Sequence, residues 1–213
     1  MPLYQFIHIA TLTLTAWFAY KGRSPFPMFL PFMVMVVFVE VWFADWYYAR
    51  YDNQFPVMNP YAKLCIYYYL FVFYRYFKDR SWGLGLKWLI IAFAILTMTY
   101  NFFFHDQTQI DYMSYNLGYL ILFPLMFRYL YEVIYKRPYY NVFHDPYLYF
   151  IFGLMLFYTS GFPILGFINI LITDNPYYTI YTKLLNLGNI FLSLAYLGAV
   201  LCSKTMKPST ILS

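Results

Sequence analysis

Apolar residues follow one another in seven long runs along this 213-residue chain. The run Leu89–Leu96 contains no polar residue, whereas a half-buried strand alternates apolar and polar positions. A helix of roughly 20 mostly apolar residues crosses the hydrocarbon core of a bilayer. The runs, which are separated by Gly, Pro and clusters of charge, predict helices at residues 3–20, 28–50, 60–77, 83–104, 112–135, 147–173 and 177–202.

The composition places these helices in a membrane. Hydrophobic residues make up 62% of the chain and charged residues 11%, against about 45–50% and about 25% in soluble domains. The excess extends over every run, so no polar segment is long enough for a separate soluble domain, catalytic or nucleic-acid-binding. The sequence predicts an all-α, polytopic integral membrane protein whose seven transmembrane helices form a single domain over residues 1–213.

Basic residues gather at the helix ends of one face, and Lys and Arg mark the cytoplasmic side. Only Arg50, Lys63 and Lys183 fall at the other face. We expect a protein of the inner (cell) membrane with its N-terminus outside and its C-terminus in the cytoplasm. The net charge of +5 then indicates topology signals and contacts with anionic lipids, not binding of nucleic acid. The cytoplasmic group is Lys21, Arg23, Arg75, Lys78, Arg80, Lys87, Arg128, Lys136, Arg137, Lys204 and Lys207.

Short matches at a nearly constant spacing indicate an internal repeat. Tyr-Lys at 20–21 recurs at 135–136, and Asn-Pro-Tyr at 59–61 recurs at 175–177. The spacing corresponds to four helices, which is the pattern of a 3+1+3 parallel repeat like those of several transporter families. Chance is the alternative interpretation, because 27 of the 213 residues are tyrosine.

Glu40 is the most informative single residue, because it lies near the middle of the predicted helix 28–50. A charged side chain at the bilayer centre costs roughly 2.5–3.5 kcal/mol on insertion scales. Glu40 must therefore face the helix bundle and be paired or carry a proton. It is either a proton, cation or ligand site, or a neutral structural glutamate that bonds to a neighbouring helix.

Two predicted helices carry a polar stripe on one face. Steps of three and four residues align such positions, and lipid cannot satisfy amide groups, so the stripes face other helices or a wet cavity. With Glu40 they predict an outward-opening or intramembrane pocket for a ligand or a proton; ordinary interhelical bonding is the alternative. The first stripe is Gln5, His8, Thr11 and Thr15, and the second is Lys183, Asn186, Asn189, Ser193 and Tyr196.

Other polar residues indicate structure more than chemistry. Arg128 and Glu132 are four residues apart on one helix and predict a structural ion pair.

The chain has no Gly-rich phosphate loop, no Cys-x-x-Cys pair and no His-Glu-x-x-His helix, so we expect neither a metal nor a cofactor. The His-Asp pairs at 105–106 and 144–145 fall at opposite predicted faces and cannot share a metal.

Several segments share their pattern with one protein family. They are Pro146–Gly153, Tyr158–Gly161, Lys183–Asn189, Asn59–Phe71 and the helix that contains Glu40. On these segments the chain resembles small seven-helix membrane proteins of unknown function from Bacteroidota. The resemblance implies a role in signalling, because such proteins are often encoded beside sensor kinases, and it supplies no catalytic residues. The family pattern has an acidic residue at the position of Tyr68. This chain therefore lacks one partner of any acid pair between that helix and the helix that contains Glu40. The topology is also similar to that of SWEET-like transporters, without their motifs.

Three functions are compatible with these features. The first is a sensory or binding component that couples the pocket to a cytoplasmic signalling partner. The second is a small-solute or proton-coupled transporter with Glu40 at the midplane, and the third, an intramembrane lipid-modifying enzyme, needs Glu40, His8 and Asn186 to converge. We favour the first over an enzyme. The expected partners are the lipid bilayer, the signalling partner and a second copy of the chain.

Overall fold

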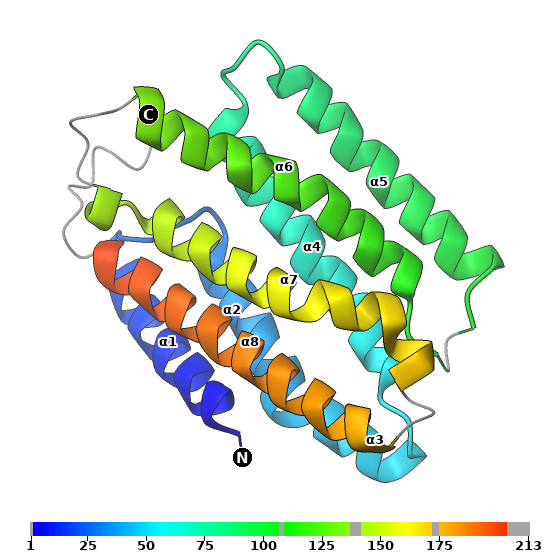
Figure 1. Ribbon diagram of the computed structural model, residues 1–213. Helices are drawn as coiled ribbons and strands as arrows, with labels where there is room; N and C mark the ends of the chain where they lie inside the picture. Colours follow the sequence, from blue (N-terminus) through cyan, green and yellow to red (C-terminus); the bar gives the residue numbers. More distant parts are fainter. Residues whose placement is uncertain (1, 107–108, 137–141, 172–174, 204–213) are drawn as a thin grey trace. The chain divides into compact units, whose positions relative to one another are not determined.

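The computed structural model describes residues 2–106, 109–136, 142–171 and 175–203, and its regular elements are all helical (Figure 1). The prediction of an all-α chain is confirmed. The elements are α1 (Leu3–Tyr20), α2 (Phe29–Val37), the π-helix η1 (Phe38–Phe43), α3 (Ala44–Tyr51), α4 (Phe55–Phe77), α5 (Gly83–Phe103), α6 (Tyr112–Lys136), the 3-10 helix η2 (Val142–His144), α7 (Pro146–Leu171) and α8 (Asn175–Ser203).

Helices α2, η1 and α3 follow one another without a break and make one long helix, so the predicted runs correspond to the observed long helices. The largest difference is at α4, which begins at Phe55 and not at residue 60. Proline is tolerated in the first turn, where its missing N–H would have no partner. Pro56 occupies that turn and Pro60 lies further inside the helix. Asn-Pro-Tyr at 59–61 is therefore not a helix start, whereas the same tripeptide at 175–177 begins α8.

The chain divides into two compact units, which are described separately. The first comprises residues 1–41 and 126–213, and the second comprises residues 42–125. In the first unit α8 packs against α7 and α1, and α1 packs against α2. Figure 1 shows α1 and α8 running in the same direction and α7 running opposite to them. In the second unit α4 packs against α5 and α3.

Aromatic rings fill the core of the first unit. Phe26, Phe29, Phe150 and Tyr196 are each at most 1% exposed. The ring centroids of Phe26 and Phe150 are 4.9 Å apart, and those of Phe29 and Tyr196 are 6.0 Å apart. Such spacings give aromatic pairs a favourable interaction beyond the area they bury. Aromatic residues make up 26% of the chain, and part of this content is thus used for packing.

Small residues let α7 and α8 approach closely. A Cβ atom added at Gly153 of α7 would collide with the Cβ of Ala195 on α8, and one added at Gly198 would lie 2.9 Å from the ring of Tyr149. Helices in membranes use glycine and alanine in this way, because van der Waals contact between backbones replaces the hydrophobic driving force.

The exposed surface is strongly apolar. Helix α1 buries its polar stripe and exposes Leu3, Phe6 and Trp17, and α5 exposes most of its large apolar side chains. Within the described residues, four helical segments are long and apolar enough to cross a membrane. These segments are Phe29–Tyr51, Gly83–Phe103, Tyr112–Tyr135 and Lys183–Cys202.

The α7–α8 contact leads to a matched pair of substitutions. Gly153→Ala should destabilise the protein by about 1–3 kcal/mol, because the added methyl group overpacks the contact with Ala195. Gly85→Ala on α5 meets no atom within 4 Å and should be neutral or stabilising by up to about 1 kcal/mol. Unfolding in detergent, followed by circular dichroism, measures both. Gly153→Ala combined with Ala195→Gly should recover most of the loss; no recovery would show that overpacking is not the cause.

Candidate functional site

The first unit places three of the predicted polar residues in one buried cluster. The Nε2 atom of His8 on α1 lies 3.2 Å from Oε2 of Glu40 in η1 and 3.2 Å from Oγ of Ser193 on α8. His8 is 3% exposed and Ser193 is 0% exposed, and the Glu40 side chain is 16% exposed. We call these residues the His8–Glu40–Ser193 cluster. It joins three helical segments that are far apart in the sequence.

The hydrogen-bond roles in this cluster place a proton on Nε2 of His8. The Ser193 hydroxyl donates to the carbonyl of Asn189 at 2.6 Å, so its oxygen accepts from His8. The same nitrogen lies 3.2 Å from Oε2 of Glu40, a distance typical of an ion pair. The other ring nitrogen, Nδ1, is buried and has no hydrogen-bond partner in the part of the chain that the structure describes. Such a group costs about 1–3 kcal/mol, so Nδ1 is an unused acceptor that points to a further ligand or proton.

The surroundings of the cluster fix the His8 ring in place. Gln5, one turn before His8, donates from Nε2 to the backbone carbonyl of Glu40. That carbonyl belongs to a π-helical segment, and such segments are frequent at functional sites. The ring of Tyr4 lies edge-on to His8 at 5.9 Å, and the ring of Tyr196 lies 6.1 Å away, measured between centroids.

The predicted stripe on α8 is only partly used. Asn189 is half-buried and contributes its carbonyl, whereas Lys183 and Asn186 are exposed. Asn186 precedes Ser193 by about two turns, or about 10 Å along the helix axis. The structure therefore does not bring Lys183 and Asn186 into the His8–Glu40–Ser193 cluster.

Arg128 and Glu132 lie close together on α6. Nη2 of Arg128 is 3.6 Å from Oε1 of Glu132, and the Arg128 side chain is 40% exposed whereas that of Glu132 is 1% exposed. The guanidinium group also lies 5.6 Å from the ring centroid of Tyr131. This geometry is the i, i+4 pairing that the sequence predicts, and it suits a structural role.

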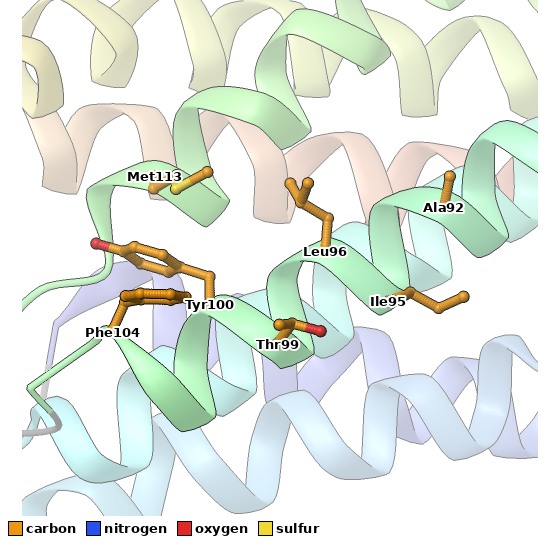
Figure 2. A pocket seen from close by; sticks show the side chains of 7 residues that line it. All are labelled: Ala92, Ile95, Leu96, Thr99, Tyr100, Phe104 and Met113. Carbon is orange, nitrogen blue, oxygen red and sulfur yellow. The ribbon is translucent and has the colours of Figure 1, made fainter.

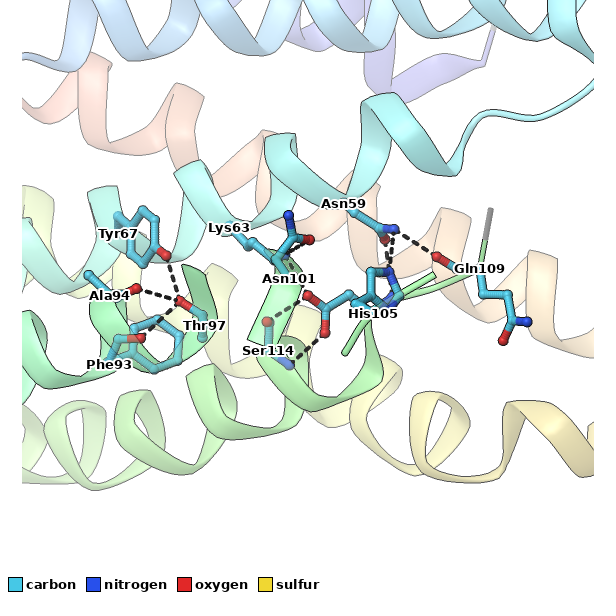
Figure 3. Close-up of polar contacts among 11 residues, drawn as sticks. Asn59, Lys63, Tyr67, Phe93, Ala94, Thr97, Asn101, His105, Gln109 and Ser114 are labelled. Carbon is cyan, nitrogen blue, oxygen red and sulfur yellow. Dashed lines mark hydrogen bonds and ion pairs between the residues drawn. The ribbon is translucent and has the colours of Figure 1, made fainter. Parts of the chain in front are cut away.

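The second unit contains a polar cluster that the sequence did not single out (Figure 3). Nζ of Lys63 on α4 lies 2.6 Å from Oδ2 of Asp111 and donates to Oδ1 of Asn101 at 2.6 Å. The side chain of Lys63 is 9% exposed and that of Asp111 is 0% exposed. From the sequence, Lys63 is expected only to be one of the few basic residues at the outer face. Asn59 and Lys63 are four residues apart on one face of α4, but the helix predicted from residue 60 leaves Asn59 outside, so the shared face could not be recognised.

Asp111 is the N-cap of α6 and is ionised through its contacts. Its Oδ1 accepts from the backbone N–H of Ser114 at 3.0 Å, and its Oδ2 accepts from the Ser114 hydroxyl at 2.6 Å. Burial alone would raise the pKa of Asp111 and is the largest influence. The hydrogen bonds from Lys63 and Ser114 and the charge of Lys63 together outweigh burial and lower the pKa below the ordinary value of 3.8.

Asn59 connects α4 to the chain between α5 and α6. Its Nδ2 donates to the carbonyl of Gln109 at 2.7 Å and lies 3.2 Å from Nε2 of His105. Its Oδ1 accepts from the backbone N–H of Asp111 at 3.2 Å. With the Lys63–Asp111 ion pair, these bonds fasten His105, Gln109 and Asp111 to α4.

An apolar hollow of about 500 Å³ lies on the surface of the second unit (Figure 2). It is lined by Ala92, Ile95, Leu96, Thr99, Tyr100, Phe104 and Met113. It offers almost no polar groups to orient a ligand, so it is not a site for chemistry. Among the described residues no group of three or more His, Cys, Asp or Glu side chains could hold a metal ion.

Comparison with known proteins identified no relative of this chain. The chain matches no protein-family model, and neither curated proteins nor solved structures contain a significant match to it.

The Lys63–Asp111 ion pair predicts strong coupling between two substitutions. Lys63→Met should destabilise the protein by about 3–5 kcal/mol, because it leaves Asp111 charged, buried and without its partner. Asp111→Asn added to Lys63→Met should recover part of this loss, because the asparagine carries no charge. Unfolding of the four variants of the cycle in detergent measures the coupling. Additive effects would mean that the pair is not buried in the folded protein.

The lowered pKa of Asp111 predicts a loss of stability in acid. Because the folded-state pKa lies below 3.8, ionised Asp111 stabilises the fold fully above about pH 5, and this contribution is lost as the pH falls through the folded-state pKa. The difference in free energy of unfolding between wild type and Asp111→Asn should be constant from about pH 7 to about pH 5 and shrink towards about pH 2. A difference that grows in acid would contradict the assignment.

Proposed function

We propose that the protein is a seven-span protein of the inner membrane, with its N-terminus outside and its C-terminus in the cytoplasm. Four helical segments have the length and apolarity of spans. The other long helices, α1, α4 and α7, have 18, 23 and 26 residues, which gives lengths of about 27 Å or more against a hydrocarbon core of about 30 Å. The skew of basic residues supports the orientation.

Within this frame we propose that the protein is a sensory or binding component that couples an intramembrane site to a cytoplasmic signalling partner. The observation that carries the proposal is the His8–Glu40–Ser193 cluster. A single buried imidazole contacts two other helical segments and keeps Nδ1 without a partner in the described chain. A proton that binds at Nδ1 adds a positive charge opposite Glu40, and a hydrogen-bond donor gives Nδ1 a partner; either event would change the packing of α1 on α8.

The same cluster also supports a second function, proton-coupled transport of a small solute. Glu40 lies near the middle of the helix formed by residues 29–51, and intramembrane acids mark proton and ion pathways. The π-helical segment that contains Glu40 interrupts the regular α-helix at the same depth. The parallel repeat remains a prediction in favour of transport. Lipid-modifying catalysis has less support, because Asn186 is exposed and about two turns from Ser193.

Substitution of Glu40 separates these functions. Glu40→Gln keeps the shape of the side chain but removes the carboxylate charge that faces His8, so a proton on His8 should no longer change the packing of α1 on α8. In wild-type protein, hydrogen exchange of peptides from α1 and α8 should change several-fold between pH 8 and pH 5, and in Glu40→Gln it should be the same at both values after correction for intrinsic rates. Asp45→Asn is the matched control, because Asp45 is an exposed acid on the same long helix, and it should behave as wild type.

A flux assay completes the test. The full chain in proteoliposomes that contain a pH-sensitive dye should show no proton flux if the protein senses. A flux that Glu40→Gln abolishes and Asp45→Asn preserves would favour the transporter instead. If Glu40→Gln matches wild type in both exchange and flux, the cluster has no functional role and both proposals fail.

A further inference from the structure

The amide group of Asn59 has a fixed orientation in the second unit. Its Oδ1 faces the backbone N–H of Asp111, which can only donate, and its Nδ2 faces the backbone carbonyl of Gln109, which can only accept. A rotation of the amide by 180° would place donor against donor and acceptor against acceptor. Asn59 is 1% exposed, so solvent does not relieve such a mismatch. The amide N–H₂ group therefore points at Nε2 of His105 (Figure 3).

This orientation determines the protonation of His105. An amide N–H₂ group is a donor only, so the imidazole nitrogen opposite it must accept. Nε2 of His105, 3.2 Å away, thus carries no hydrogen, and the neutral ring holds its hydrogen on Nδ1. An imidazolium ring has an N–H group at both nitrogens and would present a second donor to Asn59.

We propose that Asn59 and His105 form a proton-sensitive latch between α4 and the chain that connects α5 to α6. The latched state needs an unprotonated Nε2, so it excludes one proton that the open state accepts. Acid therefore shifts the equilibrium towards the open state. Histidine is the side chain that changes charge between pH 5 and pH 8. In the proposed orientation the latch faces the outside, where it responds to external pH.

The other titratable groups around the latch do not reproduce this response. Lys63 from α4 is held by Asp111, whose lowered pKa keeps the ion pair closed above about pH 5. Tyr100 from α5 stacks its ring on His105 at 5.9 Å between centroids. Asp106 follows His105 in the chain and is exposed. Between pH 5 and pH 8 the contacts of the latch therefore change through His105. The Lys63–Asp111 ion pair keeps the start of α6 in place over the same range.

Nuclear magnetic resonance of the full chain in detergent micelles tests the latch, with ¹⁵N-labelled histidine and with the assignment taken from His105→Gln. At pH 8 we expect His105 to hold its hydrogen on Nδ1 with Nε2 bare, and at pH 5 both nitrogens should be protonated. The Asp111 amide, which donates to Asn59, should lose about tenfold in protection from hydrogen exchange over the same range. That factor corresponds to the loss of about one hydrogen bond to a buried group.

Two variants make the result specific to the latch. His105→Gln offers a carbonyl oxygen that accepts from Asn59 and does not titrate, so the Asp111 amide should stay protected at both pH values. His144→Gln removes an exposed histidine before α7 and should leave the wild-type response unchanged. The proposal is overturned if Nε2 of His105 carries a hydrogen at pH 8, if wild-type protection does not depend on pH, or if His105→Gln keeps the wild-type response.

Discussion

A helix that buries its polar side and exposes its apolar side requires surroundings in which exposed apolar groups carry no penalty. Helix α1 has this arrangement, with Gln5, His8 and Thr11 inside and Phe6 and Trp17 outside. The rest of the structure depends on the same constraint. Lipid offers no hydrogen bonds, so the backbone must be helical, helices must associate through small residues such as Gly153, and each polar side chain must find its partner inside the protein.

The polar groups of the described chain find their partners in different ways. Thr11 donates to a carbonyl of its own helix, and Asp111 is bonded by Lys63 and Ser114, so these groups are satisfied without any ligand. His8 differs, because Nδ1 has no partner among the described residues although the ring is 3% exposed. This buried nitrogen without a partner among the described residues is the observation on which the proposed sensing role rests.

The helices could be predicted from the sequence because apolar runs and their breaks are local properties, and the error at Phe55 arose where Pro60 imitated a helix start. The partners within the sites could be predicted only in part. The polar stripes indicated which faces are buried, but rotation and overlap of helices decide which members touch. Ser193 meets His8, while Asn186 on the same stripe lies beyond the contact. Lys63 was missed because its pairing with Asp111 depends on how α4, α5 and the start of α6 come together.

The two histidines hold their hydrogens on opposite nitrogens, because their neighbours offer opposite groups to Nε2. Nε2 of His8 lies 3.2 Å from Oγ of Ser193, whose own hydrogen bonds to the carbonyl of Asn189, so the ring donates there. Nε2 of His105 lies 3.2 Å from the amide N–H₂ group of Asn59, so this ring accepts. The second nitrogen of each neutral ring then has the opposite character, an acceptor in His8 and a donor in His105. The neighbours that the fold brings to Nε2 thus decide which nitrogen is left to meet another group, and no sequence pattern shows this.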